Sequence, residues 1–403
     1  MIEFLKQLPH LEPYGTPVYF IYLIGALLPI FVGLFFKKRF PVYEALVSLA
    51  FIVLMLTGTD LKQIYAVLFY LFWQILWVYS YKIYRSQRDN KWVFYLHSFL
   101  VVLPLVFVKV QPAIDGTQSW MGFLGISYLT FRAVGMIIEM RDGTLKEFSL
   151  WEFLRFLLFM PTFSSGPIDR FKRFNEDYLT IPDRDELLDM LEQSVKYIML
   201  GFLYKFILAH IFGHLLLGHV KTYALLQGGI FNLGTLGVMY VFGLDLFFDF
   251  AGYSLIAVGT SYIFGVHAPD NFNKPFLSKD MKEFWTRWHI SLSRWFGDYI
   301  FSRYVLNAMR NKKFKKRATA SHVAQMITMT VMGFWHGLTW YYIAYGVYQG
   351  LMLVLTDEFT KKSKIYKKYK KEKWFQRLQI VITFNIVCFG MLIFSGFLDF
   401  YVK

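Results

Sequence analysis

Long stretches of apolar residues are the sequence feature that most constrains this chain. The first, residues 18–36, contains no charged side chain, and a helix needs about 20 mainly apolar residues to cross a bilayer. Similar runs, each broken by at most three polar groups, are 64–81, 92–108, 197–217, 230–248 and 380–397. Shorter or interrupted runs are 42–56, 122–140, 250–264, 323–337 and 340–355.

These runs predict an all-α, polytopic protein of the cell membrane with roughly ten to twelve transmembrane helices. One such run could be a buried helix of a soluble protein, but so many in one chain argue against that interpretation. The composition agrees, because 56% of the residues are hydrophobic and soluble domains average about 45–50%. Each added membrane helix packs on its neighbours, so we expect one domain over residues 1–403.

Basic residues predict which side of the membrane the loops face. The net charge of +15 is concentrated at 37–39, 82–91, 310–317 and 361–373, and loops rich in Lys and Arg stay in the cytosol. Nucleic-acid binding is the rival reading of such clusters, and the membrane context argues against it. We therefore expect membrane lipid, and no nucleic acid, to contact these clusters.

Two segments have the pattern of amphipathic helices at the membrane surface. Ser149 and Glu152 have the spacing of a capping box, so we expect a short helix there that Pro161 ends. The second segment runs from Asp280 to about Arg310, and its stripe of Phe301, Tyr304, Val305 and Ala308 is apolar. Such a stripe lies on a membrane surface or against a partner.

His336 is the first candidate for chemistry, because it is an ionisable side chain in the apolar run 323–337. Such groups are costly inside a membrane and indicate function by default. Gly333 and Gly337 flank it and are small enough to let a substrate chain approach the imidazole. A histidine that only hydrogen-bonds two helices together fits the spacing equally well.

His289 is the second candidate, with Trp285 and Leu292 expected on the same helical face at i−4 and i+3. Composition alone favours simple packing under the tryptophans. His210 and His214 have the spacing of metal ligands, but Ile211 stands where a zinc peptidase needs Glu, which favours packing. We therefore expect no metal site.

The sequence gives little support for a serine nucleophile, an ATP site or a disulfide. The pattern G-x-S-x-G and any Gly-Lys dipeptide are absent, so neither a nucleophile elbow nor a P-loop is expected. The single Cys388 excludes a disulfide within the chain. Asp245 and Asp249 lie in an apolar run, where ion pairing and direct catalysis are both possible roles. Any energy for a reaction must then arrive within an activated substrate.

Several strings resemble the membrane-bound O-acyltransferase family. They are FWTRWHISLSRWFGDY at 284–299, FWHG at 334–337 and Asp245 with DFAGYS at 249–254. PYGTP at 13–17, GISYLTFR at 125–132 and FSSGPIDR at 163–170 are similar to the branch that transfers D-alanine in Gram-positive cell walls. The bacterial branch of the family has His, rather than Asn or Asp, at the first site, as here at His289.

The resemblance implies a fold, a reaction and partners. The fold is a ring of helices around a thin centre with a tunnel. The reaction moves D-alanine from a phosphopantetheine thioester on a cytosolic carrier protein to an outward-facing hydroxyl, leading to D-alanylation of teichoic acid. A small membrane peptide and an outward-facing accessory protein are further implied partners, and this chain itself binds no cofactor.

The resemblance and the position of each residue together assign roles. His336 is the expected base, and His289 would orient the acceptor or polarise the thioester carbonyl. Carrier docking is expected at Val305, Arg310, Lys312, Lys313, Lys315, Lys316 and Arg317, because basic residues steer acidic partners. Two alternatives remain: O-acetylation of an exported polysaccharide, and a transporter or flippase with histidines on its path.

Overall fold

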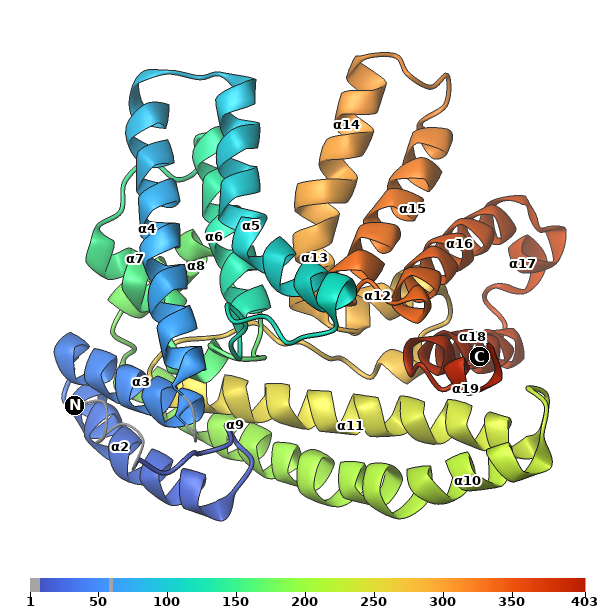
Figure 1. Cartoon of the computed structure of the whole chain (residues 1–403), viewed down its shortest axis with the longest axis horizontal. Helices are drawn as coiled ribbons and strands as arrows, with labels where there is room; N and C mark the ends of the chain where they lie inside the picture. The colour runs from blue at the N-terminus through green and yellow to red at the C-terminus, as the bar shows by residue number, and fades with distance from the viewer. Residues whose placement is uncertain (1–7, 58–60, 403) are drawn as a thin grey trace. The chain divides into compact units, whose positions relative to one another are not determined.

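A computed structural model describes residues 8–57 and 61–402, and all regular elements in them are helices (Figure 1). This confirms the all-α prediction for the described part of the chain. Contacts divide the chain into unit 1, Met1–Gly201 with Tyr253–Pro269, and unit 2, Phe202–Gly252 with Asp270–Lys403. Continuous helices run from one unit into the other, so the expectation of a single domain stays a prediction.

Six of the described helices are long and apolar enough to cross a membrane, which supports the multi-pass assignment. They are α2 (Pro17–Phe35), α4 (Lys62–Gln87), α5 (Lys91–Asp115), the continuous helix Arg184–Gln227, α11 (Leu233–Ile263) and α18 (Lys373–Phe394). A shorter apolar helix is α3 (Pro41–Leu56). The count of ten to twelve crossings, the ring and the tunnel stay predictions.

One pair of predicted spans turns out to be a single helix. The apolar runs 230–248 and 250–264 both lie in α11, which continues without a break through Asp249. The carboxylate of Asp249 accepts a hydrogen bond from Lys205 Nζ at 2.8 Å. The ion pair offsets the cost of a charged group in this apolar stretch.

The helix Arg184–Gln227 contains α9 (Arg184–Phe202), two π-helical segments over 203–216 and α10 (Leu217–Gln227). His210 and His214 lie in the second π-helical segment, and their rings stack with centroids 4.9 Å apart. On α11, Asp245 lies against Gly213, where a Cβ would come within 2.4 Å of Asp245 Oδ1. Glycine at that position therefore lets the two helices approach closely.

The short helix predicted from the capping box is α7 (Leu150–Leu157). The Ser149 side chain accepts from Glu152 N–H, and the Glu152 carboxylate accepts from Ser149 N–H, as the prediction requires. The helix ends before Pro161, which opens a 3-10 turn over Met160–Thr162. α8 (Phe171–Leu179) follows.

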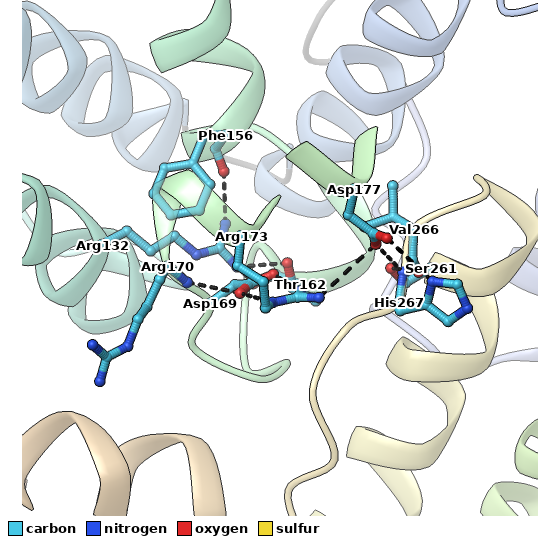
Figure 2. Close-up of polar contacts among 10 residues, drawn as sticks. All are labelled: Arg132, Phe156, Thr162, Asp169, Arg170, Arg173, Asp177, Ser261, Val266 and His267. Carbon is cyan, nitrogen blue, oxygen red and sulfur yellow. Dashed lines mark hydrogen bonds and ion pairs between the residues drawn. The ribbon is translucent and has the colours of Figure 1, made fainter. Parts of the chain in front are cut away.

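In unit 1, α6 (Ile126–Asp142) brings together two of the strings on which the family resemblance rests. Arg132 of α6 is fully buried and donates hydrogen bonds to Phe156 O at 3.0 Å and Thr162 O at 2.5 Å (Figure 2). Gly125 has positive φ, and a Cβ there would lie 2.6 Å from Phe163 O. The hydrogen bonds of Arg132 and the close approach at Gly125 both fix the chain at the start of 163–170. Packing within unit 1 therefore explains these two residues.

A chain of charged residues connects α8 to the segment that follows α11. Arg173 Nε donates to Asp169 Oδ1 at 2.7 Å, and Arg173 also lies 3.9 Å from Asp177 (Figure 2). Asp177 in turn accepts from the His267 backbone N–H at 2.5 Å and lies 3.2 Å from His267 Nδ1. The hydrogen bond with Asp177 raises the pKa of His267, against the opposing effect of burial.

This raised pKa predicts a pH-dependent contribution to stability. Below the unfolded value of about 6.5, His267 is protonated in both states and its pairing with Asp177 stabilises the fold fully. The contribution is lost as pH rises through the higher folded pKa. Because His267 is partly exposed, we expect about 0.2–1 kcal/mol.

We therefore expect His267→Gln to lower the Tm of the detergent-purified protein near pH 6, by an amount that shrinks as the pH is raised. Thermal unfolding across pH 5.5–9 measures this difference. His219→Gln, which changes an exposed histidine of α10, is the control. A Tm difference that grows with pH would contradict the assignment.

Candidate active site

His289 lies at a break between two short helices of unit 2. α12 (Met281–Arg287) begins at Asp280, whose Oδ1 accepts from Glu283 N–H at 2.8 Å. α13 (Ile290–Phe296) follows, and His289 between them has a left-handed backbone with φ 42°. The predicted continuous helix from Asp280 to Arg310 is therefore wrong, because the chain turns at this residue.

The break also changes the neighbours of His289. The prediction that Trp285 and Leu292 share its helical face is wrong, since no helix runs through position 289. Instead the imidazole is 5% exposed and lies between aromatic rings. Its ring centroid is 4.8 Å from that of Phe250 and 6.5 Å from that of Phe272.

Asn271 holds this turn in place. Its backbone oxygen accepts from Ile290 N–H at 2.9 Å, and its Oδ1 accepts from Ser291 Oγ at 2.6 Å and Ser291 N–H at 3.3 Å. The same Oδ1 lies 3.3 Å from His289 Nδ1. Since an oxygen only accepts, this contact assigns the proton to Nδ1 and the lone pair to Nε2.

His336 is the last residue of α15 (Arg317–His336). Its ring packs edge-on against Phe394, with centroids 4.8 Å apart, and 5.9 Å from the ring of Tyr342. It is near enough to His289 to act on it electrostatically. The structure thus brings the two predicted histidines together within unit 2, from positions 47 residues apart in the sequence.

The two glycines beside His336 have a role in helix packing. A Cβ on Gly333 would lie 2.6 Å from Tyr342 O, and one on Gly337 would lie 2.8 Å from the Tyr342 ring. Both positions therefore face the neighbouring helix α16 (Trp340–Lys362). Close helix packing explains these glycines, and the expectation that they make room for a substrate chain stays a prediction.

A cavity of about 530 Å³ lies beside α15 in unit 2. On α15 its wall extends from Ser321 to Met332, which is about 17 Å along the helix axis. One end is four residues past Arg317, and the other is one turn before His336. The remaining wall includes Lys282, Trp285, Thr286, Ile290, Ser293, Arg294, Phe296, Gly297, Phe301 and Leu353.

This cavity is mixed in character, with cationic and hydroxyl groups among apolar side chains. Arg294 supplies positive charge, Lys282 is paired with the buried carboxylate of Asp357, and Ser293 and Thr328 supply hydroxyl groups. Sequence reasoning found neither the cavity nor Asn271. Helical periodicity predicts which side chains share a face, and it does not predict where short helices leave a gap.

The predicted docking segment lies on α14 (Ser302–Arg310) and the loop to α15 (Figure 1). Its basic residues are all exposed: Arg310, Lys312, Lys313, Lys315, Lys316 and Arg317. Val305, by contrast, is 5% exposed, while its neighbour Leu306 is 68% exposed. The expectation that Val305 lies on an open apolar stripe is therefore wrong, because this side chain packs inside unit 2.

The family of the chain follows from its sequence match. The membrane-bound O-acyltransferase family matches residues 49–402, and this protein belongs to it. The resemblance at the two histidine strings thus extends over nearly the whole chain, and the protein is an O-acyltransferase of the membrane.

Individual relatives show which members of the family this chain is similar to. A teichoic acid D-alanyltransferase of Streptococcus thermophilus is 69% identical, over 99% of this chain and 98% of its own length. A protein of the same name from Lacticaseibacillus rhamnosus is 45% identical over 97% of this chain and 98% of its own. An alginate O-acetylase of Pseudomonas aeruginosa is 30% identical, over 68% of this chain and 48% of its own length.

The role of Asn271 gives a stability prediction. Asn271→Ala leaves the buried Ser291 hydroxyl and N–H without the acceptor described above, which costs about 1–3 kcal/mol. We expect a clearly lower Tm in detergent. Asn273→Ala, an exposed position two residues away, is the matched control, and equal Tm values for both variants would contradict this account of the turn.

Proposed function

We propose that this protein moves D-alanine from a phosphopantetheine thioester on a cytosolic carrier protein to a hydroxyl group outside, leading to D-alanylated teichoic acid. One observation carries the proposal: the cavity beside α15 extends from near the exposed basic loop to near His336. The names of the two near full-length relatives support the choice of acyl group and acceptor.

The length of the cavity matches this donor. The wall on α15 is about 17 Å long, and an extended pantetheine arm is of comparable length. Arg294 in the wall would attract the phosphate of the arm, and Lys282, which also pairs with Asp357, could contribute a further donor, since cationic side chains bind phosphate oxygens. The arm belongs to the carrier, so this chain requires no bound cofactor of its own for the proposed step.

The proposed chemistry is direct attack on the thioester. His336 takes the proton of the acceptor hydroxyl, and the oxygen attacks the thioester carbonyl. The tetrahedral intermediate collapses, the C–S bond breaks, and the thiolate leaves and is then protonated. A positioned base contributes typically 10²–10⁴-fold to such a step, and a thiolate leaves without help from a metal or ATP.

His289 would act beside the base. Its Nδ1 contact with Asn271 assigns Nδ1 as the protonated nitrogen, so Nε2 carries the lone pair. A neutral imidazole in this form can accept a hydrogen bond from the acceptor hydroxyl and orient it. Polarisation of the thioester carbonyl would instead need a proton on Nε2, so the geometry favours orientation of the acceptor.

Carrier docking is proposed at the exposed basic loop, with Leu306 as its apolar contact. Six cationic side chains between Arg310 and Arg317 would steer an acidic carrier and pair with it. Val305 would contribute indirectly, because its buried side chain packs α14 against the rest of unit 2. Binding of anionic lipid is the competing role for the same loop.

The resemblance suggests two further partners, a small membrane peptide and an outward-facing accessory protein.

O-acetylation of a polysaccharide is the alternative reaction within the same enzyme class, and the similarity to an alginate O-acetylase is the observation that supports it. Reconstituted protein given a D-alanyl carrier or an acetyl donor separates the two. Transfer of acetyl at a rate equal to or above that of D-alanyl would overturn the proposed substrate.

The role of His336 is tested by substitution. We expect His336→Ala to lower D-alanyl transfer at least 10²-fold, because the reaction loses its base. His289→Ala should also reduce transfer severely, because the acceptor hydroxyl would no longer be oriented. Release of radiolabel from D-alanyl carrier measures both, and Tm shows whether each variant is folded. His219→Ala, on exposed α10, should transfer normally; near-normal transfer by folded His336→Ala would remove His336 as the base.

Docking is tested by two changes at the basic loop. Leu306→Asp should weaken carrier binding without lowering Tm, whereas Val305→Asp should lower Tm because that side chain is buried. Reversing Lys315, Lys316 and Arg317 to Glu should slow association and flatten its salt dependence. Carrier affinity unchanged in the Leu306 and triple variants, in one detergent, would leave lipid anchoring as the role of this loop.

A further inference from the structure

A second polar pocket lies within unit 1. It has a volume of about 310 Å³ and is lined by Lys82, Arg85, Ser86, Met140, Gly143, Leu145, Lys146 and Glu147. These residues come from the end of α4, the end of α6 and the loop that follows α6. None of them takes part in the chemistry proposed above.

The loop after α6 has a defined shape that forms one wall of this pocket. Gly143 is left-handed with φ 74°, and Thr144 N–H and Leu145 N–H both return to Glu139 O, at 3.0 and 3.2 Å. This turn buries Leu145 and leaves Lys146 exposed at the rim. The backbone hydrogen bonds of this turn therefore fix one wall of the pocket.

The pocket carries positive charge. Three of its lining side chains are cationic, Lys82, Arg85 and Lys146, and one is anionic, Glu147, so the lining has a net charge of +2. Glu147 is 86% exposed, and water therefore screens its charge strongly.

The protein satisfies only part of the hydrogen-bonding capacity of these cations. Lys82 donates to Phe148 O at 2.7 Å and lies 3.5 Å from Glu147. Arg85 donates to Arg141 O at 3.4 Å and lies 3.8 Å from the half-exposed carboxylate of Asp89, while its buried Nε–H has no partner among the described residues. A guanidinium has five N–H groups and an ammonium three, so donors remain for an anion.

The surroundings of the pocket point to a lipid as the source of that anion. Large apolar side chains on α4 and α5 near this end are exposed, with Ile83 at 64%, Trp92 at 68% and Tyr95 at 56%. Both helices are long and apolar enough to span a bilayer, and aromatic residues of this kind gather at the membrane interface. Acyl chains would cover these side chains while the headgroup fills the pocket.

We propose that this pocket binds the headgroup of an anionic glycerophospholipid such as phosphatidylglycerol, at the end of α4 that its basic residues predict to be cytosolic. The phosphate would lie among Lys82, Arg85 and Lys146, and the headgroup hydroxyls would reach Ser86. Basic pockets between transmembrane helices on the cytosolic side recognise anionic headgroups in this way. A soluble phosphate ester has the same polar chemistry but no chains for the exposed apolar side chains.

Native mass spectrometry of the full-length protein in detergent tests the proposal. The probes are phosphatidylglycerol, phosphatidylcholine with identical acyl chains, and glycerol 1-phosphate. We expect one phosphatidylglycerol to stay bound at a lipid concentration that leaves phosphatidylcholine unbound. Arg85→Gln with Lys146→Gln should reduce that bound fraction at least fivefold.

The matched control removes the same charge from the neighbouring loop. Arg88→Gln with Lys91→Gln changes two cations outside the pocket, and we expect less than a twofold loss. If the double pocket variant has a lowered Tm, Lys146→Gln alone decides the matter, with at least a twofold loss expected from an exposed side chain. Three results would overturn the proposal: equal loss in pocket and control variants, no preference over phosphatidylcholine, or displacement of the lipid by millimolar glycerol 1-phosphate.

Discussion

Polar groups inside an apolar helical bundle must find their partners within the protein, and this requirement shapes the molecule more than any single motif. A bilayer offers no hydrogen bonds to an unpaired group. Lys205 and Asp249 pair with each other across two helices, and the terminal nitrogens of Arg132 donate to the backbone oxygens of Phe156 and Thr162. Each partnership then fixes how neighbouring segments approach.

The same requirement produces the turn at His289. A break between α12 and α13 exposes backbone groups in a buried place, and Asn271 satisfies them with its backbone oxygen and its side chain. The imidazole is oriented by the same side chain. A histidine on a continuous helix would instead be directed by that helix, and no asparagine would be needed to set its tautomer.

The proposed transfer from a thioester suits a site of this construction. The proposed donor supplies a good leaving group, so the protein would have to bring a hydroxyl, a base and the arm close together. Positioning of this kind accounts for a large part of many enzymatic rate enhancements. The cavity beside α15, the rings around His289 and the position of His336 at a helix end fit that task.

The sequence alone determined the class of molecule. The length of the apolar runs indicated membrane helices, Ser149 and Glu152 located a helix start, and the strings around His289 and His336 indicated the acyltransferase family. Local rules were sufficient there, because span length and capping depend on neighbours in the sequence. The same local rules predicted one helix through His289, where the structure has two, and two spans around Asp249, where it has the single helix α11.

Only the tertiary structure decided the arrangement at the site. Helical periodicity placed Val305 on an open surface and His289 inside a continuous helix, and contacts from distant residues overruled both. Gly333 serves the approach of α16, a helix whose position no local pattern of α15 encodes. Apolarity specifies that a side chain is buried, but whether protein or a partner covers it depends on packing between elements far apart in the sequence.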